Sequence, residues 1–196
     1  MFALIDNGQV AQVGELTTLF PNTSFPAGFN QAEFAAQMGA LEVIEGERKD
    51  ERFYWVTFSH YEVQGDKAVR VYTNTPKALN DREEVDEQGN PMFVQVYDPS
   101  ANDGKGAMVN TTERLVTKGL KSQWIAQAKA AAGSALAATD WMVIRKAERG
   151  VDIPADVVAE RAKIIADCTA KEAAITAATT VEALIAVVAP PNIGKL

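Results

Sequence analysis

Residues Leu136–Cys168 read LAATDWMVIRKAERGVDIPADVVAERAKIIADC, and their pattern predicts the fold of the second half. Thr139 can cap the start of a helix, and Asp140 would lie in its first turn, where the helix dipole favours negative charge. Gly150 is placed to end this helix, and Pro154 lies at or near the first position of the next one. The stretch therefore predicts two successive helices, and it holds no constellation of side chains able to do chemistry.

Helical patterns extend outward on both sides of this stretch. Thr111 or Thr112 can cap an Ala-rich helix over about 113–138, whose larger side chains include Leu120, Trp124 and Ile125. Apolar residues then recur near helical spacing as far as Ile175, and Thr180 begins a final turn or two that Pro190-Pro191 would end. An Ala-rich helix buries little apolar surface per residue, so we expect packing against neighbouring helices to stabilise it.

The first half carries strand signals instead. Residues 2–5 and 9–13 flank Asn7-Gly8, which can supply the positive φ angles of a tight hairpin turn. A short helix follows Asn30, which is its expected N-cap, and 41–44 is a candidate strand. A second hairpin is expected from 53–63 and 68–73, with a further strand at 92–97. In the first strand of that hairpin, we expect the buried face to include the more strand-prone set, Phe53, Trp55, Thr57, Ser59, Tyr61 and Val63.

These patterns predict an α+β chain with an antiparallel β-rich first domain, one short helix in that domain, and a C-terminal helical hairpin or bundle. The expected division is a β-rich domain at 1–100, a Pro/Gly/Asp-rich linker at 101–110, a helical oligomerisation or attachment domain at 111–189, and a tail at 190–196. The acidic segment 80–89 is expected to be a solvated loop.

The composition narrows the class of protein. Of 196 residues, 47% are hydrophobic and 23% charged, as in ordinary globular proteins, and the formal net charge is −7. Residues 1–100 carry 16 acidic and 7 basic side chains, whereas 101–196 carry 10 and 12. Because no concentrated basic face is present, we expect no nucleic-acid partner. The longest apolar run, about 181–189, is too short to cross a bilayer and contains a glutamate, so we expect no membrane partner and a soluble chain.

Five residues of the helical half are candidates for an interface. Trp141 could dock on a partner as a large amphipathic anchor, or it could fill a groove between helices, facing Ile164 and Ile165; the second interpretation is the simpler one. Arg145 belongs to a basic run that suits a helix C-terminus better than an anion site. The full set of interface candidates is Trp124, Trp141, Arg145, Arg161 and Ile164.

Catalytic, cofactor and metal sites are not expected. His60 is the only histidine and Cys168 the only cysteine, so neither a zinc cluster nor a disulfide can form, and Cys168 is best explained as a small buried hydrophobe. The carboxylates of the acidic segment, Asp81, Glu83, Glu84, Asp86 and Glu87, lack the spacing of a calcium loop. No phosphate-binding glycine motif, zinc-protease motif or nucleophile elbow occurs.

The helical half resembles the C-terminal part of tail-fibre and tail-fibre-assembly proteins of tailed bacteriophages. The matching features are Thr139-Asp140-Trp141, the Ile153-Pro154 step and Arg161, and the likeness covers roughly the last 80 residues. It implies a virion-tail protein, made in the bacterial host cytoplasm, that forms homo-oligomers and contacts other tail or fibre proteins. The alternative within the family is an assembly chaperone that leaves the particle. The chain lacks the terminal Pro-rich peptide common in those chaperones, although Ala189-Pro190-Pro191 could be a remnant of it.

An alternative of another class is a hydrolase or small-molecule-binding domain. The aromatic strand 53–63 could line its pocket, with His60 and Glu62 as the first acid–base candidates. No nucleophile or cofactor motif accompanies them. We therefore expect a protein that acts by contact and is not an enzyme.

Overall fold

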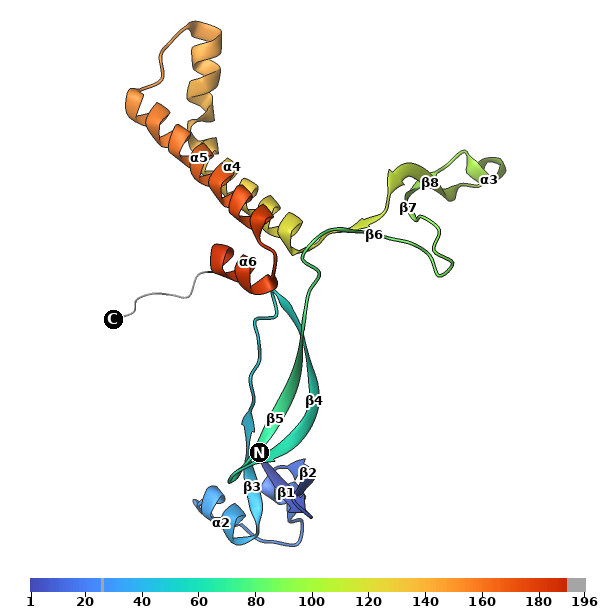
Figure 1. Cartoon of the computed structure of the whole chain (residues 1–196), viewed down its shortest axis with the longest axis vertical. Helices are drawn as coiled ribbons and strands as arrows, with labels where there is room; N and C mark the ends of the chain where they lie inside the picture. The colour runs from blue at the N-terminus through green and yellow to red at the C-terminus, as the bar shows by residue number, and fades with distance from the viewer. Residues whose placement is uncertain (26, 190–196) are drawn as a thin grey trace. The chain divides into compact units, whose positions relative to one another are not determined.

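The computed structural model of the chain describes residues 1–25 and 27–189, so the predicted tail at 190–196 lies outside the described residues. The chain divides into two compact units, Met1–Pro76 and Lys77–Leu196. The first unit contains β1 (Phe2–Asp6), β2 (Gln9–Gly14), α1 (Leu16–Leu19), α2 (Gln31–Gln37), β3 (Ala40–Glu45), β4 (Tyr54–Gln64) and β5 (Lys67–Pro76). The second contains β6 (Arg82–Glu83), β7 (Phe93–Asp98), α3 (Ala101–Gly104), β8 (Ala107–Arg114), β9 (Val116–Thr117), α4 (Leu120–Arg149), α5 (Ala155–Ala177) and α6 (Val181–Val188) (Figure 1).

The predicted α+β class is confirmed, with a mostly antiparallel sheet in the first unit and helices α4 to α6 in the second. The sheet has the order β2-β1-β3-β5-β4, in which only the β3–β5 pair is parallel. Asn7 and Gly8 adopt φ angles of 49° and 78°, which confirms the predicted β1–β2 hairpin turn. The expected hairpin of β4 and β5 also forms.

One face of this sheet carries the core of the first unit. Buried Phe2, Leu16, Leu19, Ala35 and Ala40 pack with the half-buried side chains of Leu4, Phe20, Phe25, Phe29 and Phe34. Four of the phenylalanine rings contact one another with centroid distances between 4.9 and 6.0 Å. Asn30 caps α2 as predicted, because its side-chain oxygen accepts the N–H groups of Ala32 and Glu33. The first unit thus buries a core of its own.

A β-bulge in β4 changes which side chains face inward, so part of the predicted buried face is wrong. Tyr54 is buried, whereas Trp55, from the face expected to be inside, is 63% exposed. The register shifts between Phe58 and His60, so that Phe58 pairs with Tyr72 but Tyr61 pairs with Arg70. Since one extra residue moves every later side chain to the opposite face, Tyr61 shares the face of Tyr54.

The segment expected as a linker is part of a two-stranded ribbon. Residues 101–110 form α3 and the beginning of β8, and β8 pairs with β7. The helix expected to begin near Glu113 begins at Leu120, because 111–114 complete β8, where β-branched Thr111 and Thr112 favour a pleated strand. The acidic segment 80–89, expected to be a solvated loop, contains the short strand β6, which pairs with β9.

Helix α4 is continuous, so the predicted helix start at Thr139 is wrong. The Thr139 hydroxyl donates a hydrogen bond of 3.0 Å to the Leu136 carbonyl inside the helix and caps nothing. The predicted stop at Gly150 is confirmed by its φ of 68°, and Pro154 is the N-cap of α5. Thr180 caps α6 by accepting the Ala183 N–H, as predicted.

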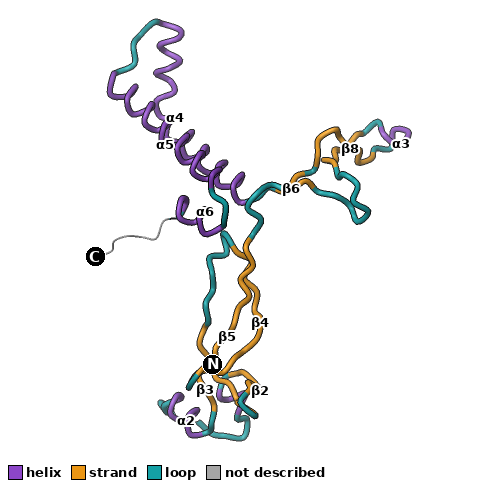
Figure 2. The backbone as a smooth tube through the Cα atoms, viewed as in Figure 1, coloured by secondary structure: helices purple, strands orange, loops and turns teal. Residues whose placement is uncertain are grey.

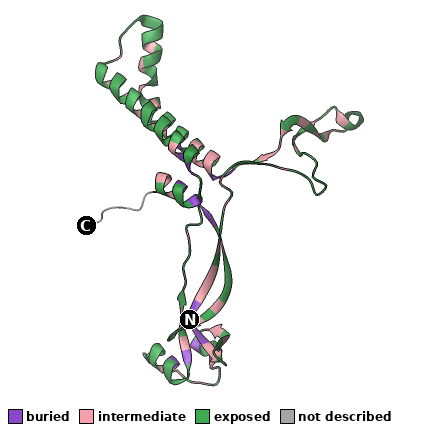
Figure 3. Cartoon of the chain, in the orientation of Figure 1, coloured by how far each residue is buried: buried purple, intermediate pink, exposed green. Residues whose placement is uncertain are grey.

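The two long helices pack side by side but bury few residues. Among 53 helical positions, Leu120 and Ala128 in α4 and Ile175 in α5 are buried, and Figure 3 shows most of both helices exposed. Figure 2 shows the last turns of α4 diverging from α5 before the connecting loop. Across residues 1–25 and 27–189, no helix has the length and apolar character needed to span a membrane.

Candidate functional site

Arg161 of α5 joins the two long helices. Its guanidinium, 17% exposed as a side chain, donates to the Leu136 carbonyl at 2.9 Å, to the Thr139 hydroxyl at 2.6 Å and to the Asp140 carboxylate at 2.9 Å. The Thr139 hydroxyl in turn donates to the same carbonyl. Three residues quoted for the family likeness, Thr139, Asp140 and Arg161, therefore meet in one hydrogen-bonded group, which we call the Arg161 node.

The Arg161 node fixes how α5 lies along α4. Hydrogen bonds from a guanidinium to a carboxylate are stronger than neutral ones, and the planar fork restricts their direction. A slip of one helix by a turn would move the guanidinium about 5.4 Å and break all three bonds. The node is therefore a positioning device for the hairpin.

A cavity of about 330 Å³ opens beside the Arg161 node, where the helices begin to diverge. Its lining comes from one turn of α4 and two turns of α5: Ala135, Thr139, Asp156, Val157, Glu160, Arg161 and Ile164. Ile164, a predicted interface residue, is half-buried in this wall. The lining combines one cation, two carboxylates, aliphatic side chains and the Thr139 hydroxyl, which already donates to the Leu136 carbonyl and accepts from Arg161.

Trp141 is not packed against α5, so its predicted burial is wrong. Its side chain is 52% exposed, and so is that of Ile165, its expected neighbour. The cause is the continuity of α4: two residues beyond Thr139, Trp141 lies about 200° around the helix from the side that faces Arg161. The Arg145 guanidinium stacks over the indole at 4.8 Å, so Arg145 supports the exposed ring and is not a helix cap. Trp124, the remaining candidate, is half-buried.

A second polar group lies farther along the same helix pair. Glu172 accepts an ion pair from Lys129 at 3.1 Å and a hydrogen bond from the Cys168 thiol at 3.4 Å. The hydrogen bond from Lys129 lowers the pKa of Glu172, while burial and the contact with Glu172 raise the pKa of Cys168. Cys168 is half-buried in a polar setting, so the prediction of a buried hydrophobe is only partly met. A raised pKa disfavours the reactive thiolate.

The acidic segment has a structural role that its sequence does not reveal. Asp81 accepts the Gly119 N–H at 2.9 Å and an ion pair from Lys118 at 2.9 Å, next to the first turn of α4. Hydrogen bonds from Ser122, Lys118 and the Gly119 amide lower the pKa of Asp81 to about 2. Asp81 therefore caps α4 from 38 residues away in the sequence. No local signal could have identified it.

Three other carboxylates of that segment also have partners. Glu83 pairs with Arg114, Glu84 with Arg82, and Asp86 accepts the N–H groups of a tight turn that ends at Asn90. Within residues 1–25 and 27–189, no group of three or more His, Cys, Asp or Glu side chains could hold a metal ion.

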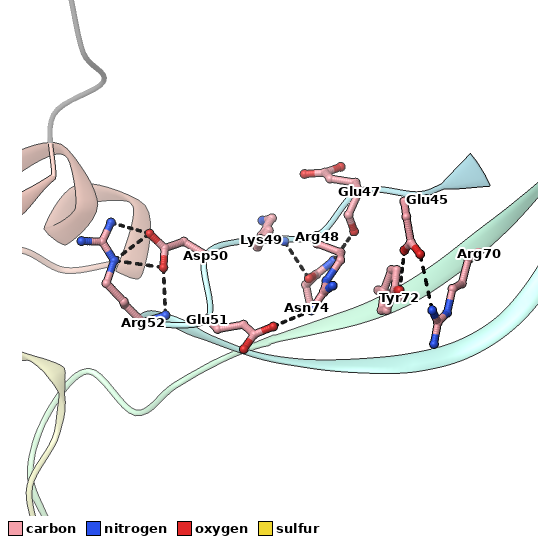
Figure 4. Close-up of polar contacts among 10 residues, drawn as sticks. All are labelled: Glu45, Glu47, Arg48, Lys49, Asp50, Glu51, Arg52, Arg70, Tyr72 and Asn74. Atoms are coloured by element: carbon pink, nitrogen blue, oxygen red, sulfur yellow. Dashed lines mark hydrogen bonds and ion pairs between the residues drawn. The ribbon is translucent and has the colours of Figure 1, made fainter. Parts of the chain in front are cut away.

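In the first unit, side chains tie an extended segment to the β4–β5 hairpin (Figure 4). The Asn74 side chain accepts the Lys49 N–H at 3.0 Å and donates to the Glu47 carbonyl at 3.2 Å. These two bonds take the place of the backbone hydrogen bonds that a neighbouring strand would make. Tyr72 donates to Glu45, and this bond lowers the pKa of the carboxyl and raises that of the phenol. Arg48 stacks over the Tyr72 ring at 5.0 Å. The members satisfy one another, which is typical of a structural network.

The residues of the alternative enzymatic interpretation lie on the exposed face of β4. His60 Nδ1 is 3.0 Å from the Ser59 hydroxyl, and both side chains are exposed. For the described residues, no hydrogen bond joins a carboxylate to the other ring nitrogen, so the third member of a catalytic triad is missing. Glu62 instead accepts a hydrogen bond from Gln64.

The sites therefore differ in what they can do. The polar groups position helices and strands, while the large exposed side chains offer apolar contact area.

Comparison of the chain with models of protein families, with curated proteins and with solved structures gives no match.

Proposed function

We propose that this chain is a structural component or assembly factor of a bacteriophage tail fibre and acts through protein–protein contacts. Its partners are other tail or fibre proteins and a second copy of itself, and its place is the virion tail. The proposal draws on the likeness of Thr139-Asp140-Trp141, Ile153-Pro154 and Arg161 to such proteins.

The observation that carries this proposal is the exposed apolar surface of a helix pair whose register is fixed by the Arg161 node. Val158 and Ile165 of α5 are 49% and 52% exposed and lie two turns apart on one face. Large apolar side chains held on a defined helix face are typical of surfaces that bind another protein. We assign this α5 face, defined by Val158 and Ile165, to the fibre partner.

The experiment is a binding measurement with a fibre protein encoded beside this chain. The full chain is co-produced with that protein, and the affinity is measured for the wild type, for Val158→Ser with Ile165→Ser, and for the control Trp55→Ser. The double variant should bind about tenfold more weakly or worse, since two anchors of an interface are lost. The control should bind normally, although Trp55 is 63% exposed.

Two results would contradict the assignment. A wild-type chain that forms no complex with the fibre protein would overturn the function, and equal affinities for the double variant and the wild type would overturn the α5 face. Mass spectrometry of purified particles separates the two roles in the family, because a component stays in the virion and a chaperone leaves it.

A further inference from the structure

The sheet of the first unit ends in β4, whose outer side is open along half of the strand. The strand order is β2-β1-β3-β5-β4, so β4 lies at the edge and pairs with β5 alone (Figure 1). The bulge after Phe58 divides β4 into two halves. The C-terminal half faces β2 across a cavity of about 510 Å³, which is lined by residues 8–10 and 60–63. Among the described residues, no strand pairs with the outer side of the N-terminal half, 54–58.

The register of the sheet shows which backbone groups of this half point outward. The Gly46 N–H donates to the Arg70 carbonyl, so the backbone groups of Arg70 face the β3 side of β5. Successive residues of a strand point these groups in opposite directions, so those of Thr73 face β4, where Thr73 is paired with Thr57. The residues on either side of Thr57 therefore direct their N–H and C=O groups away from β5.

Those residues are Val56 and Phe58, and their outward groups form a short stretch of open sheet edge. Across residues 1–25 and 27–189, no backbone hydrogen bond reaches these groups. The side chains of Thr57 and Phe58 are exposed, so the edge is accessible. Two residues apart, the donors and acceptors have the spacing of a hydrogen-bonded ladder. An extended peptide presents matching groups at that spacing, so the chemistry of this edge indicates another strand as its ligand.

The open half of β4 also lacks the features that usually prevent the addition of a strand. Natural edge strands are protected by charged side chains, by proline or by bulges that twist the edge away. Residues 54–58 read YWVTF and contain neither a charged residue nor proline, and the bulge begins only after Phe58. Phe58, which is 46% exposed, adds apolar surface beside the unpaired backbone groups. The edge is therefore suited to strand addition.

The charge of the first unit indicates what kind of strand fits this edge. Residues 1–76 carry 10 acidic and 5 basic side chains, a net charge of −5, which repels a second copy or an acidic segment and attracts a basic one. We propose that the outer edge of β4 at 56–58 binds an extended strand of another protein, uncharged where it pairs and flanked by lysine or arginine. The inference goes beyond the proposed function, because it assigns a surface of the other unit to a second partner.

A synthetic peptide titrated into the full chain and followed by amide NMR signals tests this assignment. The probe has three Thr-Val repeats between two lysines and is blocked at both ends. At saturation, amide hydrogen exchange at Val56 and Phe58 should slow by about tenfold or more, whereas the Thr73 amide, which already faces β4, should not change. A probe with glutamates in place of the lysines should bind about threefold or more weakly at low salt. A probe N-methylated at every amide of the repeats should not bind, because it has no donors for the ladder.

Thr57 and Thr73 provide a matched pair of variants. Both are exposed threonines, and they pair with each other, but Thr57 belongs to the edge strand and Thr73 to the inner strand β5. Thr57→Lys should weaken binding of the lysine-flanked probe by about tenfold, whereas Thr73→Lys should change it by less than about twofold. Circular dichroism checks that both variants fold, and the N-methylated probe tests the edge in the wild type.

Three results would overturn the proposal. They are unchanged Val56 and Phe58 signals at millimolar probe, equal binding of the N-methylated probe, and equal binding of the glutamate-flanked probe. Protection of the two amides that rises with chain concentration in the absence of probe would also overturn it, because a second copy would then occupy the edge. Each of these results leaves binding of the fibre protein at the α5 face untouched.

Discussion

The phenylalanine cluster of the first unit and the contact between α4 and α5 stabilise their elements in opposite ways. In the first, Phe2 is buried with Leu and Ala side chains, and four half-buried phenylalanines pack ring against ring beside them. In the second, the two helices bury Leu120, Ala128 and Ile175 and are joined by two polar groups centred on Arg161 and Glu172. The first unit therefore has an apolar core of its own, whereas the helix pair has a defined register but buries few side chains.

The largest expected difference concerns one aromatic residue from each region. Phe2→Ala should lower the free energy of unfolding by about 3–5 kcal/mol, because Phe2 is 5% exposed in a packed cluster. Trp141→Ala should change it by less than about 0.5 kcal/mol in the dissociated chain. Denaturant unfolding followed by circular dichroism measures both. A loss of several kcal/mol for Trp141→Ala would show that the helices conceal a core.

The Arg161 node should give the next largest effect. Arg161→Met removes the hydrogen bonds but keeps much of the apolar stem, and it should cost about 1–3 kcal/mol. Arg161→Lys keeps the charge but lacks the planar guanidinium. Its free energy of unfolding should lie between those of Arg161→Met and the wild type. Arg149→Met, at the exposed end of α4, is the control and should stay within about 0.5 kcal/mol. If Arg161→Met unfolds like the control, the node does not hold the helices.

Asp81 makes the stability of the second unit depend on pH. Its pKa falls from 3.8 to about 2 on folding, so its contribution is present above pH 4 and disappears as the pH falls toward 2. Asp81→Asn should therefore melt at a lower temperature than the wild type at pH 7, and the two should converge near pH 2. Glu148→Gln, another exposed carboxylate, should follow the wild type throughout. A difference at pH 2 as large as that at pH 7 would contradict the capping role.

Replacing two glycines of the helical half by alanine should change the free energy of unfolding in opposite directions. Gly133→Ala should stabilise the dissociated chain by about 1 kcal/mol, since its surroundings are open. Gly119→Ala should destabilise, because an added Cβ would lie 2.4 Å from the backbone of Asn80. Denaturant unfolding at low protein concentration measures both changes.

The smallest effect is expected at His60. His60→Ala removes an exposed side chain whose ring contacts only the adjacent Ser59 hydroxyl among the hydrogen bonds of the described residues. Stability should change by less than about 0.5 kcal/mol, and fibre binding should not change. A binding or turnover assay in which this variant loses activity while remaining folded would reopen the enzymatic interpretation.

Features with local signals could be predicted from the sequence. Asn7-Gly8, Asn30, Gly150 and Thr180 each act on residues within one turn, and each has the expected conformation or hydrogen bond. Features that depend on distant partners could not. Thr139 has the chemistry of a helix cap, but its hydroxyl is used by Arg161, 22 residues later.

The candidate site was predicted in part. The sequence singles out Arg161 and Ile164 as interface candidates, and the structure has both line the cavity between α4 and α5. Trp141 was misplaced through the error at Thr139, since a new helix would have rotated it toward α5. Asp81 and the bulge in β4 depend on strand pairing and long-range contacts, which composition and spacing do not encode.

The order of contacts along the helix pair has a consequence for mechanical load. The start of α4 and the end of α5 lie at the same end of an antiparallel pair, so a force applied there peels the helices apart instead of shearing them. The Lys129–Glu172 ion pair would be loaded first and the Arg161 node only afterwards. Because peeling breaks such contacts one at a time, the hairpin should yield at low force and then resist at the node, a two-step extension that optical tweezers could resolve.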